Sequence, residues 1–185
     1  AATTISDLPP RNIVAKVCYL YGTNAISQLC VKKNPLDTSD KVCTVEGAKA
    51  VFSSSAPVQV ENFRQNQVGK NRVGFSFKVH KIGTGKIYEK ATKCGLETTP
   101  RENRVWVEVS AQGWEGIRCT NLQGGSSGTV QLPISTGETT IPEVTVICTK
   151  DLDIVSDYPK DITIKLVYDY EEDVSTQLVI RHTVI

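Results

Sequence analysis

Apolar residues recur at every second position along most of this chain, and this period constrains the fold more than any other sequence feature. Val73, Phe75, Phe77 and Val79 alternate with small or polar neighbours in VGFSFKVHK. The same alternation occurs in PVQVENF (57–63), VWVEVS (105–110), EVTVIC (143–148), ITIKLVYDY (162–170) and QLVIRHTV (177–184). A period of two is typical of half-buried β-strands, and no segment of ten or more residues carries a convincing helical stripe. The pattern predicts an all-β protein.

Clusters of turn-forming residues separate these strands, at residues 83–85, 124–128, 135–138 and 171–175. Gly83-Thr84-Gly85 is followed by KIY, without the third glycine and the helix that a dinucleotide-binding loop requires. We therefore expect a sheet corner there, with the glycines supplying positive φ angles. Short strands joined by turns, without intervening helices, predict an immunoglobulin-like β-sandwich.

The front of the chain predicts a hairpin separate from that sandwich. In NIVAKVCYLYGTNAISQLCV (12–31), a turn near Asn24 would place Cys18 opposite Cys30. We expect an N-terminal extension at 1–10, a disulfide-bearing hairpin and loop at 11–50, and the sandwich at 51–185. A chain of 185 residues is long enough for one well-buried core and too short for two ordinary domains with a linker.

The six cysteines indicate three disulfides and an oxidising compartment, because their number is even and no close CxxC pair occurs. Six buried thiols in a cytosolic protein are the alternative. We predict a Cys119–Cys148 bond, since both residues end alternating strands. For the rest we prefer Cys18–Cys30 and Cys43–Cys94 among the connectivities that six cysteines permit.

Composition favours a secreted protein that neither binds nucleic acid nor inserts into a membrane. The chain has no Met and opens with Ala1-Ala2-Thr3-Thr4, small residues typical of the position after signal-peptidase cleavage. We expect an extracellular or cell-surface location after signal-peptide removal. A net charge of +1 gives no basic surface for nucleic acid, and no apolar run is long enough for membrane insertion.

No residue pattern indicates catalysis, a metal or a cofactor. His80 and His182 are the only histidines, both lie in alternating strands, and neither has a nucleophile nearby in the sequence. The acidic groups at 151–157 and 169–173 offer oxygen ligands for calcium, but the EF-hand pattern is missing and solvated loops are the favoured interpretation. Trp106 lies opposite its valine neighbours, and we favour core or interface packing over carbohydrate binding. We predict that the protein is not an enzyme.

Several segments together resemble an immunoglobulin-like β-sandwich domain of secreted archaeal cell-surface proteins, particularly those of small-genome lineages. The segments are FSFKVHKIGTGKIY with its upstream strand, Cys94, NRVWVEVSAQGWEGIRC, EVTVICTKD and SDYPKDITIKLVYDY. The chain is similar, more loosely, to cell-adhesion-related domains of bacterial and archaeal envelopes. The resemblance covers about residues 12 to 185 and implies a surface or appendage domain without a catalytic role. It implies no site residues.

Two functions remain open after these observations. The first is a structural subunit that polymerises into an extracellular filament or surface assembly, with Thr3, Thr4 and Ile5 as a strand inserted into the next subunit. Pro9-Pro10 would stiffen the exit of that strand, although insertion into the same domain is the alternative. The second is a monomeric adhesion or ligand-binding module whose partners are other cell-surface proteins or glycans.

Overall fold

The computed structural model describes residues 10–34, 42–45, 47–69, 71–95, 101–134 and 142–179, and in these ranges the chain is all-β. The strands are β1 (Arg11–Val31), β2 (Gly47–Ala48), β3 (Val51–Ser53), β4 (Val58–Gly69), β5 (Arg72–Lys81), β6 (Lys86–Glu89), β7 (Arg104–Ser110), β8 (Arg118–Cys119), β9 (Ser127–Gln131), β10 (Glu143–Asp151) and β11 (Tyr158–Leu178). Two short 3-10 turns, η1 (Lys93–Gly95) and η2 (Thr120–Leu122), are the helical elements of the described ranges. The all-β prediction is confirmed.

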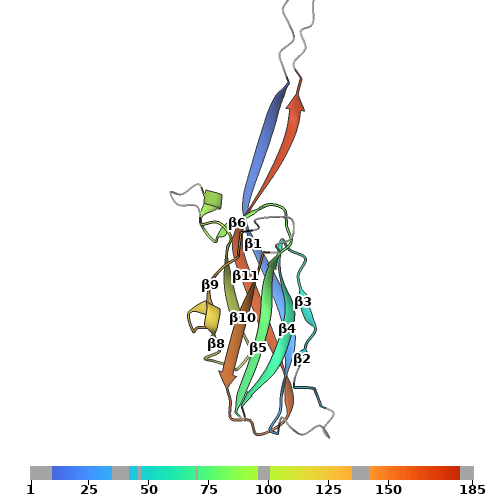
Figure 1. Cartoon of the computed structure of the whole chain (residues 1–185), viewed down its shortest axis with the longest axis vertical. Helices are drawn as coiled ribbons and strands as arrows, with labels where there is room; N and C mark the ends of the chain where they lie inside the picture. Colours follow the sequence, from blue (N-terminus) through green and yellow to red (C-terminus); the bar gives the residue numbers. More distant parts are fainter. Residues whose placement is uncertain are drawn as a thin grey trace, which may run out of the picture.

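The strands form two antiparallel sheets that face each other across one core (Figure 1). The β1 sheet has the order β3-β1-β11-β7-β9, with β6 also paired to β11. The β5 sheet has the order β2-β4-β5-β10-β8. The largest fully buried side chains come from both sheets, from η2 and from the residue after β9: Tyr168, Tyr170, Phe63, Phe75, Phe77, Leu29, Ile87, Leu122, Leu132, Ile162, Ile164 and Leu166.

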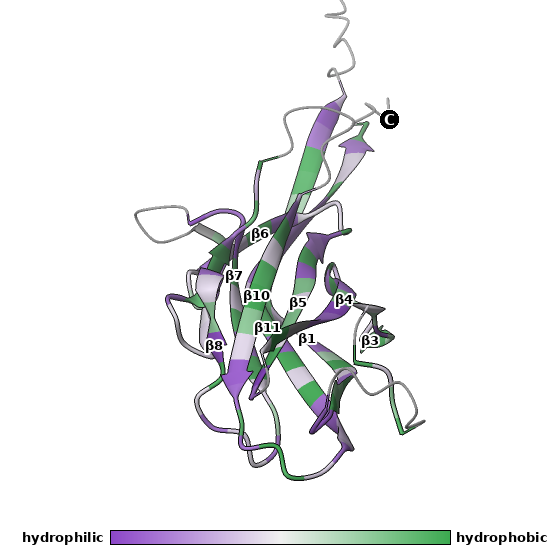
Figure 2. Ribbon diagram, turned by 60° about the horizontal axis from the view of Figure 1, so that its bottom comes forward, coloured by the Kyte–Doolittle hydropathy of each residue, from purple (hydrophilic) through white to green (hydrophobic). Residues whose placement is uncertain are grey.

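Five of the six alternating segments fall in strands, as predicted: they lie in β4, β5, β7, β10 and β11. In β5, Val73, Phe75, Phe77 and Val79 are buried against the opposite sheet, and His80 lies on the other face. Hydrophobic and hydrophilic residues alternate along β1 and β11 in the same way (Figure 2). Burial of one face per strand is what a period of two requires, since successive side chains point to opposite sides of a sheet.

The predicted N-terminal hairpin at 11–50 is wrong. β1 runs without a turn from Arg11 to Val31 and pairs along its whole length with β11, so it is a strand of the sandwich. Its alternation continues through the supposed turn, and two of the three buried positions there, Thr23 and Ser27 on either side of Ala25, are polar. Their hydroxyls donate to the carbonyls of Val58 (2.7 Å) and Ala50 (2.8 Å), which makes burial of these polar groups tolerable.

The predicted turn at 171–175 is also wrong, because β11 is one 21-residue strand that continues to Leu178. The acidic run Glu171-Glu172-Asp173 lies within it, opposite Cys18, Val17 and Lys16. Of the strand predicted at 177–184, only Gln177 and Leu178 belong to β11, and residues 180–184 lie outside the described residues. Residues 135–138, where another turn was predicted, lie outside the described residues.

The corner at Gly83-Thr84-Gly85 is confirmed, but its physical cause differs from the prediction. These residues connect β5 in one sheet to β6 in the other, and neither glycine has a positive φ angle. Glycine is required by close packing instead: a Cβ atom on Gly83 would lie 2.5 Å from the Tyr170 hydroxyl, and one on Gly85 would lie 2.6 Å from Cζ of the same ring.

All six cysteines are paired, and one of the three predicted pairings is correct. Cys119–Cys148 joins β8 to β10 as expected. The predicted Cys18–Cys30 and Cys43–Cys94 bonds are wrong, because the bonds formed are Cys18–Cys94 and Cys30–Cys43. Since β1 does not fold back on itself, Cys18 and Cys30 lie far apart along one strand and cannot meet.

Candidate assembly surface

The outer ends of β1 and β11 leave the sandwich together as a two-stranded ribbon (Figure 1). We call this ribbon the arm and define it as Arg11–Cys18 of β1 with Glu171–Leu178 of β11. Its eight opposed pairs run from Cys18↔Glu171 at the root to Arg11↔Leu178 at the tip. At roughly 3.4 Å per residue the arm is about 27 Å long. All its residues are exposed except Glu171, which is half-buried.

One face of the arm is apolar. The face of β1 and β11 that packs against the β5 sheet lower down continues outward with Ile13, Ala15, Val17, Val174 and Leu178. We call these five residues the apolar arm face. Val17 is 58% exposed and Val174 is 72% exposed, because no described strand of the second sheet reaches them. A contiguous set of exposed apolar side chains is typical of an interaction surface.

The opposite face of the arm is mainly polar. It carries Lys16 and Glu171, whose charged groups are 3.8 Å apart, together with Asp173. Val14 is the large apolar residue on this side and is 52% exposed. An isolated two-stranded ribbon is marginally stable in water, so an arm of this length needs support at its root or along its faces.

A cluster of four tyrosines supports the root on the side of the apolar arm face. The ring centroids of Tyr19 and Tyr170, and of Tyr21 and Tyr168, are 5.8 Å apart. The Tyr170 hydroxyl accepts a hydrogen bond from the N–H of Gly85 (2.9 Å). Burial and the Glu172 carboxylate raise the pKa of Tyr19, so this hydroxyl stays protonated over the neutral range. Tyr168 and Tyr170 belong to the core, and Tyr19 and Tyr21 pack against it, so the tyrosines extend the core to the root of the arm.

A disulfide and a buried carboxylate support the root on the other side. Cys18 is bonded to Cys94, and Asp169, which is 4% exposed, accepts hydrogen bonds from the N–H groups of Ala91 (3.2 Å) and Lys93 (2.7 Å). Ala91, Lys93 and Cys94 all have positive φ angles, between 50° and 66°. L-residues rarely adopt this conformation, so the disulfide and the carboxylate together hold the 91–94 segment in place.

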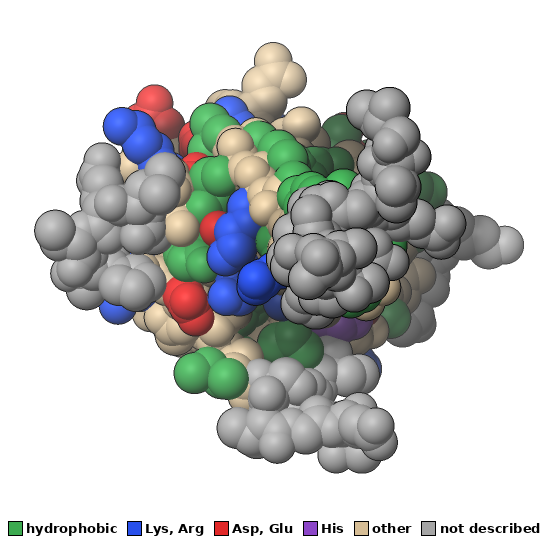
Figure 3. All heavy atoms as spheres, turned by 90° about the horizontal axis from the view of Figure 1, so that it is seen from above, with side chains coloured by type: hydrophobic (Ala, Val, Ile, Leu, Met, Phe, Trp, Pro, Cys, Tyr) green, Lys and Arg blue, Asp and Glu red, His purple; other side chains and the backbone are tan. Residues whose placement is uncertain are grey.

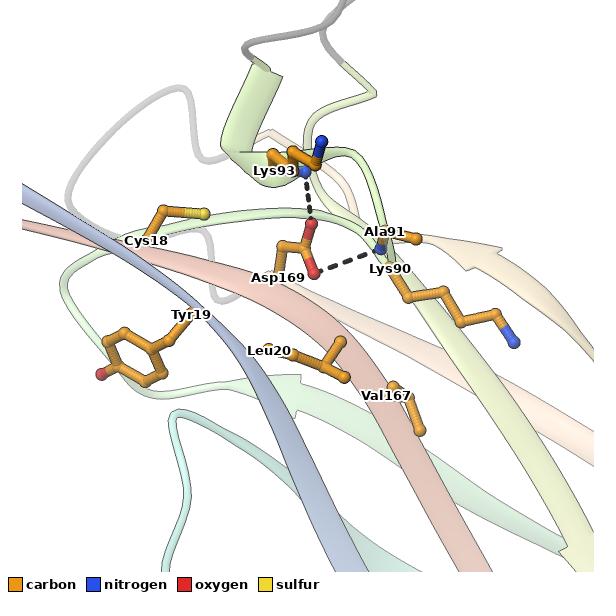
Figure 4. A pocket seen from close by; sticks show the side chains of 8 residues that line it. All are labelled: Cys18, Tyr19, Leu20, Lys90, Ala91, Lys93, Val167 and Asp169. Atoms are coloured by element: carbon orange, nitrogen blue, oxygen red, sulfur yellow. Dashed lines mark hydrogen bonds between the residues drawn. The ribbon is translucent and has the colours of Figure 1, made fainter.

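A groove lies between that segment and the outer face of the β1 sheet (Figure 4). Its volume is about 590 Å³, and its lining is mostly apolar. Leu20 and Val167 come from the two long strands, while Lys93 comes from the 91–94 segment and Lys90 directly precedes it. Trp106 lies close by, and the Lys90 ammonium is 3.6 Å from its ring centroid.

The favoured placement of Trp106 on the face opposite Val105 and Val107 is confirmed, because both valines are buried in the core.

The remaining residues singled out in the sequence do not come together at a reactive site in the described part of the chain. His80 Nδ1 is 3.2 Å from Glu61 Oε2, close enough for an ion pair with a protonated imidazole but without the angle of a hydrogen bond. His182 lies outside the described residues, as do Thr3, Thr4 and Ile5.

The acidic residues are dispersed or already paired. Asp151 lies opposite Arg72, and hydrogen bonding to that guanidinium lowers the pKa of the carboxyl. Asp157 accepts the N–H of Lys33 (2.7 Å), and Asp169 holds the 91–94 segment. Among the described residues, no three His, Cys, Asp or Glu side chains are grouped as a metal site would require.

The arm end of the molecule shows hydrophobic, basic and acidic side chains side by side, and no single charge dominates the described surface visible from above (Figure 3). None of the described residues forms a helix with the length and apolar character needed to cross a membrane. Three disulfides are consistent with an extracellular or secreted protein.

The residues of the apolar arm face follow the alternating pattern, but the sequence-based predictions do not include this surface. They place Val17 in a hairpin and Val174 in a turn, and both predictions are wrong. The signal that could have found the arm is the equal length of the two terminal alternating segments, which allows one uninterrupted pairing. Comparisons with protein-family models, curated proteins and solved structures gave no match to this chain.

Proposed function

We propose that the protein is a non-catalytic structural subunit of an extracellular filament or cell-surface assembly. The observation that carries this proposal is the apolar arm face, which stands away from the sandwich and exposes Ile13, Val17 and Val174. Water-exposed apolar side chains gain roughly 1.5–3 kcal/mol each when fully buried. A surface of this kind on an arm supported at its root on both sides favours contact between subunits over a free monomer.

Strand exchange of the N-terminal segment is part of the same proposal. Pro10, the first described residue, adjoins the tip of the arm, about 27 Å from the root. A donor strand containing Thr3, Thr4 and Ile5 would therefore start at the tip of the arm, away from its own sandwich. We also propose that the sandwich is immunoglobulin-like and related to archaeal surface domains. Its two antiparallel sheets over one core support this part of the proposal.

Substitution on the two faces of the arm tests the assembly role. Val17→Asp with Val174→Asp places two charges on the apolar arm face, and we expect this variant to stay monomeric where the native protein assembles. Val14→Asp is the matched control, because Val14 has nearly the same exposure on the opposite face. Electron microscopy and sedimentation velocity of the oxidised proteins measure the outcome. Equal assembly of all three proteins contradicts the proposal.

Deletion of residues 1–8 tests strand exchange separately from the arm. The truncated protein should keep its three disulfides and its fold but lose long filaments. Filaments that form as readily without these residues rule out the donor strand and leave the arm as the assembly element. A native protein that is monodisperse at high concentration rules out both.

The groove beneath the 91–94 segment favours a second function, a monomeric ligand-binding or adhesion module. Its volume of about 590 Å³ is in the usual range for small-molecule sites, and Lys90 stands beside an apolar floor that includes Leu20. Such a groove suits an apolar group that carries an acid. Anilinonaphthalene sulfonate is a probe of this chemistry, and Leu20→Trp should reduce its binding by filling the groove. Unchanged binding in that variant, or binding that is lost with Val17→Asp and Val174→Asp instead, contradicts this second function.

A further inference from the structure

We infer that two copies of this chain pack their apolar arm faces together in antiparallel orientation. The inference rests on the proposed assembly function and specifies its first contact. It follows from the order of side chains along the arm, which contains one cation and one anion at opposite ends of an otherwise uncharged face.

Four rows of opposed residues make up this side of the arm. From tip to root they are Arg11/Leu178, Ile13/Thr176, Ala15/Val174 and Val17/Glu172. Side chains of one row project together because opposed residues in an antiparallel pair lie on the same side of the sheet. The positive charge is therefore in the first row, the negative charge is in the fourth row, and the two central rows are neutral.

Antiparallel packing brings these opposite charges together. When the tip of one arm lies over the root of the other, the Arg11 row faces the Glu172 row of the second copy, and the same contact repeats across the two-fold axis. Parallel packing would instead place the two Arg11 rows together and the two Glu172 rows together. Like charges at an interface are unfavourable, so the charge order selects the antiparallel arrangement.

The central rows fit the same arrangement by size. The axis falls between the second and third rows, so Ile13 of one copy faces the row of Ala15 and Val174 in the other. Ala15 is small and leaves room for the larger Ile13 side chain. Alternation of large and small residues across facing positions is how two sheets interdigitate.

Antiparallel overlap also agrees with the position of Pro10, the first described residue. With the arms overlapped, Pro10 of one copy lies at the root of the second copy's arm. Residues 1–9 would then begin beside the second copy's sandwich, which is where the proposed strand exchange needs them. The two proposals are thus compatible but separable by experiment.

The contact is small, and the expected affinity is correspondingly weak. A face about 27 Å long and two strands, or about 10 Å, wide falls well below the roughly 800 Å² per partner of a standard interface. We therefore expect a dimer that dissociates on dilution, with a dissociation constant in the micromolar range or weaker. Salt should weaken it further, because the charged rows lie at the exposed ends of the contact.

Charge reversal at the two ends of the face tests the orientation, with sedimentation equilibrium at low salt as the readout. Arg11→Glu places two acidic rows together, and Glu172→Arg places two basic rows together. Each should weaken the native dimer about tenfold or more. The double variant and an equimolar mixture of the two single variants restore opposite charges, so both should associate like the native protein. The residues lie outside the core, and circular dichroism with non-reducing peptide mapping checks that the fold is intact.

Lys16→Glu is the control, since Lys16 lies on the polar face of the same arm and should not change association. The inference is overturned if all three single reversals weaken dimer association equally, or if none of them weakens it. Filaments that persist in Arg11→Glu and Glu172→Arg overturn the arm dimer and leave the proposed assembly function standing. Dimers with the expected charge dependence, in a protein that never assembles further, support the arm dimer and contradict the filament.

Discussion

Gln65 of β4 pairs through its side chain with the backbone of Cys30 in the opposite sheet. The Gln65 carbonyl oxygen accepts the N–H of Cys30 (2.8 Å), and its amide nitrogen donates to the Cys30 carbonyl (2.6 Å). Cys30 lies opposite Pro159 in β11, but its N–H and carbonyl point toward the other edge of β1. At that edge β3 pairs only with residues 25–27, so no described strand reaches Cys30 there. The side chain therefore takes the place of a missing neighbouring strand.

Gln65→Leu should destabilise the protein by about 2–4 kcal/mol, because it leaves a buried N–H and a buried carbonyl without partners. Gln65 is 1% exposed, and leucine fills nearly the same space, so lost packing contributes little. Gln28→Leu is the control, since its amide bonds Asp161 on the surface and its loss should cost less than about 0.5 kcal/mol. Denaturant unfolding of the oxidised proteins gives both values. Equal effects of the two substitutions contradict the prediction.

Asp169→Ala should release the 91–94 segment. The substitution removes an acceptor of two charge-assisted hydrogen bonds, at Ala91 and Lys93, with an expected cost of about 2–3 kcal/mol. Amide exchange at residues 91–94 should accelerate more than exchange in β5. Asp173→Ala is the matched control on the same strand and the same face, where the side chain is exposed. A segment that stays protected in Asp169→Ala would show that the Cys18–Cys94 bond alone holds it.

Gly85→Ala should be costly although Gly85 has an ordinary φ angle. A Cβ atom there would lie 2.6 Å from Cζ of Tyr170 and would also contact the Glu171 carbonyl, so backbone at the arm root must shift. We expect a loss of about 1–3 kcal/mol, typical of overpacking. Gly22→Ala is the control, since its nearest neighbour would be the Leu166 carbonyl at 3.8 Å, an ordinary contact. That substitution should be neutral or slightly stabilising, and the opposite order of stabilities contradicts the prediction.

The local pattern of apolar residues was sufficient to locate most of the strands. It was not sufficient to show how the two longest strands, β1 and β11, pair with each other. The period of two located β5, β7, β10 and the first half of β4, because their buried positions there carry apolar residues. In β1 the buried positions include Thr23 and Ser27, and their burial depends on carbonyls of Val58 and Ala50 that are distant in sequence. A hydrophobicity pattern cannot detect a hydroxyl that is buried because a remote acceptor satisfies it.

The candidate site was less predictable than the fold for a related reason. Both faces of the arm are exposed, so no core selects the pairing register of its two strands. The acidic run at 171–173 also has the composition of a turn. The Cys18–Cys94 bond spans a sequence separation of 76, which spacing along the chain does not reveal. Cys119–Cys148 was predictable because both residues end alternating strands that pair directly.

Tyr168 should make stability sensitive to alkaline pH. Burial raises the pKa of Tyr168 above its ordinary value of about 10, and its hydroxyl accepts the N–H of Val58 (3.1 Å). Between the unfolded and the folded pKa, the unfolded chain loses the proton and the folded chain keeps it. The contribution of Tyr168 to stability is therefore present below about pH 10 and is lost as pH rises through the folded pKa.

Tyr168→Phe should lower stability by about 1–3 kcal/mol at neutral pH, because the Val58 N–H loses its buried acceptor. The difference between the native protein and this variant should narrow as pH rises above 10, since only the native protein carries the Tyr168 titration. Burial also raises the pKa of Tyr88, so both proteins should share an alkaline loss of stability from that residue. Denaturant unfolding at several pH values, with tyrosinate absorbance followed in parallel, measures the difference directly. A gap between the two proteins that stays constant or widens above pH 10 contradicts the assignment of the raised pKa to Tyr168.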